Sequence, residues 1–174
     1  MRVACLPPSM ASKLENIFLF SLLNTLDRNT FQLKIIFIPI IEELKFLETE
    51  GITVNISNRS IKIFFKLVVI LGDNLGLHTL LGLVESFSAN YCCRFCLTLK
   101  EDMYLIVREE ECILRTIENY EIALSTIGDS VSSFGVKEEC IFHELPNFHM
   151  TKNPSVDILH DWLEGIVKND LAKS

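Results

Sequence analysis

The sequence has no uncharged run of about 20 apolar residues, the length that a membrane-spanning helix needs. Its most apolar region, residues 63–84, is interrupted by Lys66, Asp73, Asn74 and His78. A Lys or Asp at the centre of such a helix costs roughly 3 kcal/mol. The second apolar run, residues 17–26, is too short to span a bilayer. We therefore expect both regions to be core and the protein to have no membrane partner.

The N-terminal residues also lack the basic, apolar and small-residue blocks of a secretory signal, so we do not expect secretion. Without secretion, the six unevenly spaced cysteines are not expected to form a disulfide framework. Metal binding or burial is the expected role of these thiols.

Clusters of basic residues are missing as well. Residues 1–100 carry ten Lys and Arg against eight Asp and Glu, while residues 101–174 carry six against fifteen. The two parts are therefore +2 and −9, which together give the net charge of −7. Without clustered Lys and Arg to displace counterions from phosphates, DNA binding is expected to be weak or absent.

What the sequence does contain is a globular composition, 49% hydrophobic and 22% charged. The spacing predicts a helix over residues 38–50, with Pro39 in its first turn, followed by a strand over 52–56. A second strand is predicted over 61–71. Its end is apolar on both faces, as in a central strand covered by helices. A helix over 75–87 follows, and this order indicates an α/β (α+β) layered domain.

The later part of the chain is cysteine-containing, acidic and predicted to be mostly helical. We expect helices near 105–114 and 117–127, and a final amphipathic helix over 156–171. The change of character near residue 91 predicts two domains, residues 1–90 and 91–174.

Asp73 follows a predicted strand and opens a helix, which is where open α/β sheets place ligand-binding groups. A carboxylate there suits Mg²⁺, which prefers carboxylate, phosphate and water oxygens. The alternative is that Asp73 caps the helix by accepting a hydrogen bond from its first amides. The pattern alone leaves both interpretations open.

Cys93 and Cys96 have the CxxC spacing that lets two thiolates bind one Zn²⁺. A structural zinc site needs four ligands. The candidates for the remaining two are His143, His149, Cys112 and Cys140. A redox pair and two buried thiols are the alternatives. Cys92 is a further thiol without an assigned role.

Asp157 and His160 lie three residues apart, so on a helix they share a face and can form a hydrogen bond or bind a ligand together. A solvated helix face is the alternative interpretation of this pair.

These motifs, in this order, resemble transposon-derived proteins of animal genomes related to the CACTA-like (En/Spm) DDE transposases. The matching segments are Cys-Leu-Pro-Pro at 5–8, residues 14–19, Ile-Leu-Gly-Asp-Asn-Leu-Gly at 70–76, residues 82–87 and 89–91, Cys-Arg-Phe-Cys at 93–96, Asn-Phe-His at 147–149, and residues 156–165. The similarity covers essentially the whole chain.

The resemblance implies a partial RNase H-like core with a mostly helical insertion, and a nuclear location if the protein is expressed as in the family; the alternative location is cytoplasmic. In the family, three acidic residues hold two Mg²⁺ ions for DNA cleavage and strand transfer. Asp73 matches the second acid, Cys93 and Cys96 match a zinc half-site, and Asp157 and His160 match an Asp-x-x-His signature. The first and last acids are expected to lie upstream and downstream of this chain.

Three hypotheses follow from this comparison. The first is a truncated, non-catalytic transposase remnant, because one carboxylate cannot organise two Mg²⁺ ions. The second is an adopted protein–protein interaction module. The third is an active nuclease that takes its missing acids from a partner chain.

Overall fold

The computed structural model describes residues 5–11, 13–19, 21–22, 24–127, 134–157 and 161. The chain divides into two compact units, Met1–Ile36 and Phe37–Ser174. The expected domain boundary near residue 90 remains a prediction. No helix in the described ranges combines the length and apolar character needed to cross a bilayer.

The first unit contains α1 (Pro8–Ala11), a 3-10 helix η1 (Leu14–Asn16) and α2 (Thr25–Thr30). Asn24 caps α2, since its side-chain oxygen accepts the Leu26 N–H at 3.0 Å. Leu19 and Leu22, in the apolar run predicted to be core, are more than 80% exposed. That prediction is therefore wrong for these two residues.

Helix α3 (Leu33–Thr49) begins in the first unit and continues into the second. The helix predicted over 38–50 is confirmed, but it starts earlier, so Pro39 lies inside it and not in its first turn. Gly51 ends the helix with a positive φ of 68° and donates its N–H to the Phe46 carbonyl at 2.9 Å.

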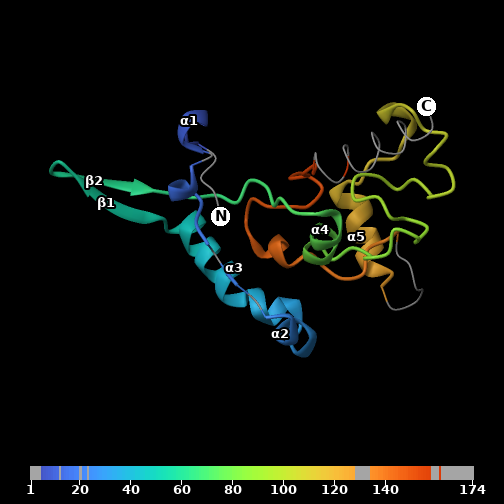
Figure 1. Ribbon diagram of the computed structural model, residues 1–174, viewed down its shortest axis with the longest axis horizontal. Helices are drawn as coiled ribbons and strands as arrows, with labels where there is room; N and C mark the ends of the chain where they lie inside the picture. The colour runs from blue at the N-terminus through green and yellow to red at the C-terminus, as the bar shows by residue number, and fades with distance from the viewer. Residues whose placement is uncertain are drawn as a thin grey trace. The chain divides into compact units, whose positions relative to one another are not determined.

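Strands β1 (Ile52–Ile56) and β2 (Arg59–Ile63) form an antiparallel hairpin in which Ile52 lies opposite Ile63 (Figure 1). Ser57 and Asn58 make the turn, both with positive φ, as tight hairpin turns require. The strand predicted over 61–71 is wrong beyond Ile63. Residues 64–71 form no strand, and many of their side chains are exposed, Leu71 by 71%.

Helix α4 (Asn74–Leu80) is shorter than the helix predicted over 75–87. It ends because Gly82, with φ at 71°, turns the chain into a short antiparallel contact in which Leu83 lies opposite Val136. The Val84 N–H donates to the Gly135 carbonyl at 2.9 Å in the same contact. A pairing partner more than 50 positions away has replaced the last turns of the predicted helix.

Beyond residue 91, most described residues form turns and loops, not the mostly helical insertion that was predicted. The regular elements described there are η2 (Glu109–Glu111), α5 (Ile117–Ser125) and η3 (Ile141–Glu144). The helix predicted over 105–114 is wrong, because its end pairs with the CxxC segment instead. The next predicted helix is confirmed as α5. Most of the helix predicted over 156–171 lies outside the described residues.

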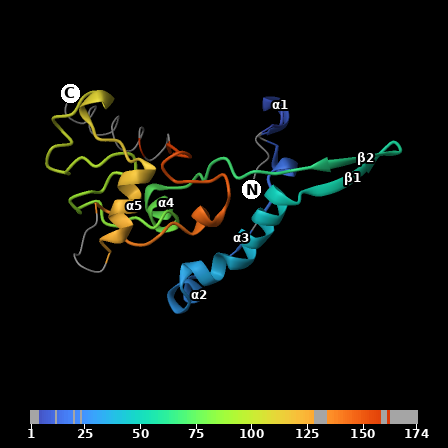
Figure 2. The same ribbon diagram turned by 180° about the vertical axis from the view of Figure 1, so that it is seen from behind.

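The core of the second unit surrounds Tyr120 of α5, which is fully buried. Its hydroxyl accepts the Cys140 N–H at 2.9 Å. Helices α4 and α5 lie side by side in both views of the ribbon (Figures 1 and 2). Other buried side chains of this unit are Leu77, His78, Leu83, Ala123, Val136, Phe142, Leu145, Phe148 and Met150. The observed architecture is thus a mixed α/β fold with one small antiparallel sheet in its described part.

Candidate functional site around Arg94

Asp73 lies at the N-cap of α4, where its Oδ1 accepts the Gly76 N–H at 2.6 Å. The capping interpretation of Asp73 is therefore confirmed. The residue is exposed, so its carboxylate also faces solvent. A bound Mg²⁺ at Asp73 stays a prediction.

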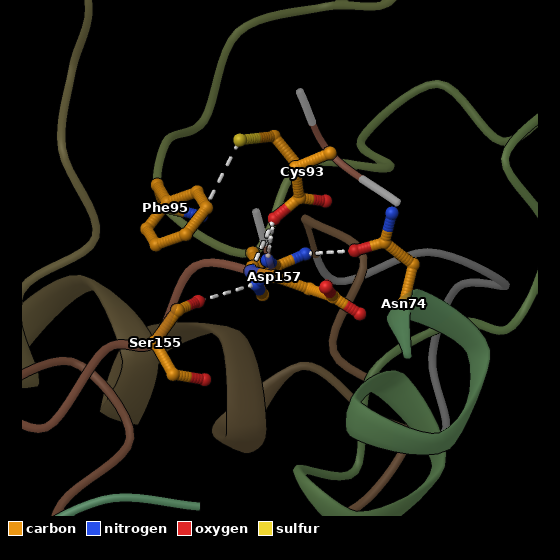
Figure 3. Close-up of polar contacts among 7 residues, drawn as sticks. Asn74, Cys93, Phe95, Ser155 and Asp157 are labelled. Carbon is orange, nitrogen blue, oxygen red and sulfur yellow. Dashed lines mark hydrogen bonds and ion pairs between the residues drawn. The ribbon is translucent and has the colours of Figure 1, made fainter. Parts of the chain in front are cut away.

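Arg94, between the two cysteines of the CxxC turn, is the centre of a group of polar contacts. Figure 3 labels two of its partners, Asn74 and Ser155. Its side chain is only 7% exposed. Nη1 donates to the Asn74 side-chain oxygen, and Nε donates to the Ser155 carbonyl at 3.1 Å. Nη2 forms an ion pair with the Asp161 carboxylate at 2.5 Å. The guanidinium also lies over the Phe95 ring, 4.6 Å from its centroid.

Asp161 is held in its ionised form by these contacts. Burial alone would raise the pKa of its carboxyl, but three hydrogen bonds and the Arg94 charge outweigh burial and lower it. The donors are the Asp157 N–H, at 2.9 Å, and the side chains of Arg94 and Asn74. A charged partner and three hydrogen-bond donors together hold the Asp161 carboxylate in place.

Three motifs singled out from the sequence therefore meet at one guanidinium. Asn74 follows Asp73, Arg94 belongs to the CxxC turn, and Asp161 belongs to the segment that contains the Asp-x-x-His signature. Of that signature, His160 lies outside the described residues, and the Asp157 backbone binds Asp161. Sequence reasoning missed Asn74, Arg94 and Asp161. The signal available in the sequence was an arginine inside a tight turn, because a buried arginine needs an acidic residue elsewhere in the chain to neutralise it.

In the CxxC turn, two backbone N–H groups point at the sulfur of the first cysteine. The Cys93 sulfur accepts the N–H groups of Phe95 and Cys96 at 3.3 and 3.4 Å. The Cys96 thiol donates to the Thr98 hydroxyl at 3.3 Å. Burial raises the pKa of Cys93. For Cys96 burial acts in the same direction, but hydrogen bonds and the Arg115 charge prevail and lower its pKa.

His143 and His149 belong to a different cluster. Their rings stack with centroids 3.9 Å apart, and both meet the Tyr120 ring edge-on. His143 Nε2 accepts the Met150 N–H at 3.1 Å. Burial and the neighbouring His149 lower the pKa of His143 to about 4. These contacts make the two histidines a neutral, half-buried pair packed against Tyr120.

Cys140 also lies apart from the CxxC turn, buried beneath Tyr120, and burial raises its pKa to about 12. Within the described ranges, no three His, Cys, Asp or Glu side chains already stand in an arrangement that holds a metal ion. All six cysteines are free thiols.

Comparisons of the chain with protein-family models, curated proteins and solved structures found no match.

Proposed function

We propose that the chain derives from the catalytic core of a CACTA-like DDE transposase and acts without cleaving DNA on its own. The parent activity would be Mg²⁺-dependent cleavage and transfer of DNA strands on an RNase H-like fold. In this proposal the present chain keeps the structural connections of that core and has lost, as an isolated polypeptide, its phosphodiester chemistry.

The observation that supports this proposal is the meeting of the three motif segments at Arg94. In a metal-dependent nuclease, the acid-bearing turn must be fixed to within a fraction of an ångström. Arg94 ties Asn74, the residue next to Asp73, to the CxxC turn and to Asp161. Such a connection is expected if the turn at Asp73 once had to hold a catalytic carboxylate.

The lack of cleavage that we propose is argued from metal chemistry. Two Mg²⁺ ions beside a phosphodiester need several carboxylate ligands to balance their charge. Asp73 is not part of a group of three potential ligands anywhere in the described part of the chain. The Asp73 carboxylate is instead occupied, through one oxygen, with the cap of α4.

The test is a nicking assay on labelled duplex DNA with Mg²⁺ or Mn²⁺, using the full chain and Asp73→Asn. Asparagine caps helices about as well as aspartate but is neutral, so this variant keeps the fold and removes the carboxylate. We expect no metal-dependent cleavage from either protein. Cleavage by the wild-type chain that Asp73→Asn abolishes would overturn the proposal.

A second candidate function, binding of another protein, is favoured by the exposed apolar side chains of the hairpin and the segment after it. These residues are Ile52, Ile56, Ile61, Phe64, Phe65, Val68, Val69 and Leu71. Contiguous exposed apolar surface is typical of interaction sites. A partner recovered with the wild-type chain and lost with Phe64→Ser plus Val68→Ser, but not with Asp73→Asn, would support this function.

We also propose that Cys93 and Cys96 form half of a zinc site. The two N–H groups that point at the Cys93 sulfur favour the thiolate, the form that binds Zn²⁺, although burial outweighs them and raises the pKa of Cys93. Zinc would supply a structural cross-link at the Arg94 turn.

A further inference from the structure

The hairpin of β1 and β2 has two open edges in the described part of the chain, where no third strand joins it (Figure 1). The backbone groups of an edge strand can pair with another strand. Pairs in an antiparallel hairpin alternate between exchanging two hydrogen bonds and none, and the pair that flanks a two-residue turn, here Ile56 and Arg59, exchanges two. Thr53 and Asn55 therefore direct their backbone groups away from β2. Among the described residues, neither forms a backbone hydrogen bond outside the hairpin.

One face of the hairpin is apolar, apart from the residue that follows the turn. Because antiparallel partners share a face, Ile61 and Ile63 of β2 lie with the apolar residues of β1. Those β1 residues are Ile52, Val54 and Ile56. Ile52, Ile56 and Ile61 are 38%, 53% and 44% exposed. A two-stranded hairpin is only marginally stable in water, and further strands beside it would stabilise it.

The two edges differ in charge. Strand β2 carries Arg59 and Lys62, and charged side chains on an edge strand oppose pairing with another chain. Strand β1 reads Ile-Thr-Val-Asn-Ile and has no charged residue, proline or glycine. Four of its five residues are β-branched, which favours the extended conformation. The edge of β1 is therefore the one that accepts a further strand.

The residue order of β1 is complementary to itself. When two copies of β1 run antiparallel about Val54, Ile52 of one copy lies opposite Ile56 of the other, and Thr53 lies opposite Asn55. Apolar residues then meet apolar residues on one face, and polar residues meet polar residues on the opposite face. The outward backbone groups of Thr53 and Asn55 form the hydrogen-bonded pairs. Val54 meets its own copy on the two-fold axis.

The charges at the ends of β1 fit the same arrangement. Because Ile56 lies opposite Ile52 of the second copy, the hairpin turn of one copy approaches the end of α3 in the other. Arg59 follows the turn, and Glu50 follows the last residue of α3. Both residues are exposed, and neither is in an ion pair among the described residues. The two-fold axis brings a cation towards a carboxylate at both ends of the interface.

We propose that β1 pairs antiparallel with β1 of a second copy of this chain and joins the two hairpins into one four-stranded sheet. This inference rests on the protein-binding candidate function above and names the partner. The charged β2 strands form the outer edges of the sheet, so the assembly ends at a dimer. A five-residue edge is a small interface, and we expect the dimer to form at concentrations of about 100 µM.

The experiment is sedimentation velocity of the full chain from about 1 µM to about 1 mM, a range that brackets a weak interface. We expect a monomer at the lowest concentration and a dimer at the highest. A chain that stays monomeric throughout would overturn the proposal, whether or not the hairpin binds some other protein. Assembly that continues beyond the dimer would overturn it as well.

Val54 gives the sharpest variants, because it meets itself on the axis. Val54→Lys and Val54→Glu each place two like charges opposite one another, so each variant alone should lose the dimer. An equimolar mixture of the two should restore it. Ile61→Lys is the matched control, since it adds the same charge to the same face away from the axis and should keep the dimer. A mixture that stays monomeric contradicts the pairing about Val54.

A pair of proline variants tests the edge itself, with circular dichroism to show that each protein folds. Thr53→Pro removes an outward N–H from β1, and Ser60→Pro removes one from β2, so neither interrupts the pairing within the hairpin. Only Thr53→Pro should abolish the dimer, and equal dimerisation of the two would overturn the proposal. Phe64 and Val68 lie outside β1, so loss of another protein partner in their double variant is a separate result. No DNA is present, so the nicking assay is also independent.

Discussion

Arg94 and Asp161 lie 67 positions apart in the sequence, and their side chains form an ion pair of 2.5 Å in the folded chain. The pair is largely buried, with 7% and 22% of the two side chains exposed. It is surrounded by the Asn74 side chain, the Ser155 carbonyl and the Asp157 N–H. Because each charge has further hydrogen-bond partners, removing one member leaves the other buried without compensation.

We therefore expect Arg94→Gln to lower the free energy of unfolding by about 3 kcal/mol, the lower end for a broken buried pair. Arg94→Lys keeps the charge but not the planar fork that reaches several acceptors, so its loss should be smaller. Urea unfolding followed by circular dichroism measures both. The matched control is Arg108→Gln, because Arg108 is exposed and its change should cost less than about 0.5 kcal/mol. A cost for Arg94→Gln as small as that of the control would show that the pair contributes nothing.

The relation between Arg94 and Asp161 also shows what the sequence cannot reveal. Local patterns predicted the helix over 38–50, the strand over 52–56 and α5, and offered the cap at Asp73 as one of two interpretations. Each of these depends on residues within a few positions of one another. The partners of Arg94 depend on chain segments about 20 to 67 positions away, and no local spacing encodes them.

The wrong predictions have the same origin. Residues 64–71 have the composition of a covered central strand, but β-structure needs a partner, and in the described chain β2 ends at Ile63. Residues 113 and 114, at the end of the helix predicted over 105–114, instead pair with residues 96 and 97.

The stacked histidines predict a loss of stability in mild acid. The folded-state pKa of His143, about 4, lies below its ordinary value of 6.5, because the ring is buried beside His149. The unfolded chain then binds more protons than the folded chain between these two values. The stabilisation is complete above about pH 6.5 and is lost as the pH falls towards 4.

Protonation would also remove the Nε2 lone pair of His143 that accepts the Met150 N–H. Urea midpoints measured from pH 7 to pH 4 should fall for the wild-type chain. They should fall less for His143→Gln, whose side-chain oxygen can still accept the Met150 N–H. An NMR titration that placed the His143 pKa at or above 6.5 would contradict the expected burial of a neutral ring.

Two glycines give a matched test of the backbone geometry that ends α4. Gly82 has a φ of +71°, and a Cβ there would lie 2.2 Å from the Glu138 carbonyl oxygen. The Gly82 carbonyl in turn accepts the N–H groups of Lys137 and Glu138 at 2.9 and 3.1 Å. The two segments therefore cannot move apart without breaking these hydrogen bonds. At Gly72 the nearest atom to an added Cβ is a Leu77 side-chain carbon at 3.7 Å, an ordinary contact.

We therefore expect Gly82→Ala to cost more than about 2 kcal/mol, from positive-φ strain together with the displaced pairing of Leu83 and Val136. Gly72→Ala should change stability by less than about 1 kcal/mol in either direction. Thermal and urea unfolding of the two variants under identical conditions measure the difference. Because both substitutions add one methyl group to the same region, comparable stabilities would mean that the tight approach of Gly82 to Glu138 does not exist in solution.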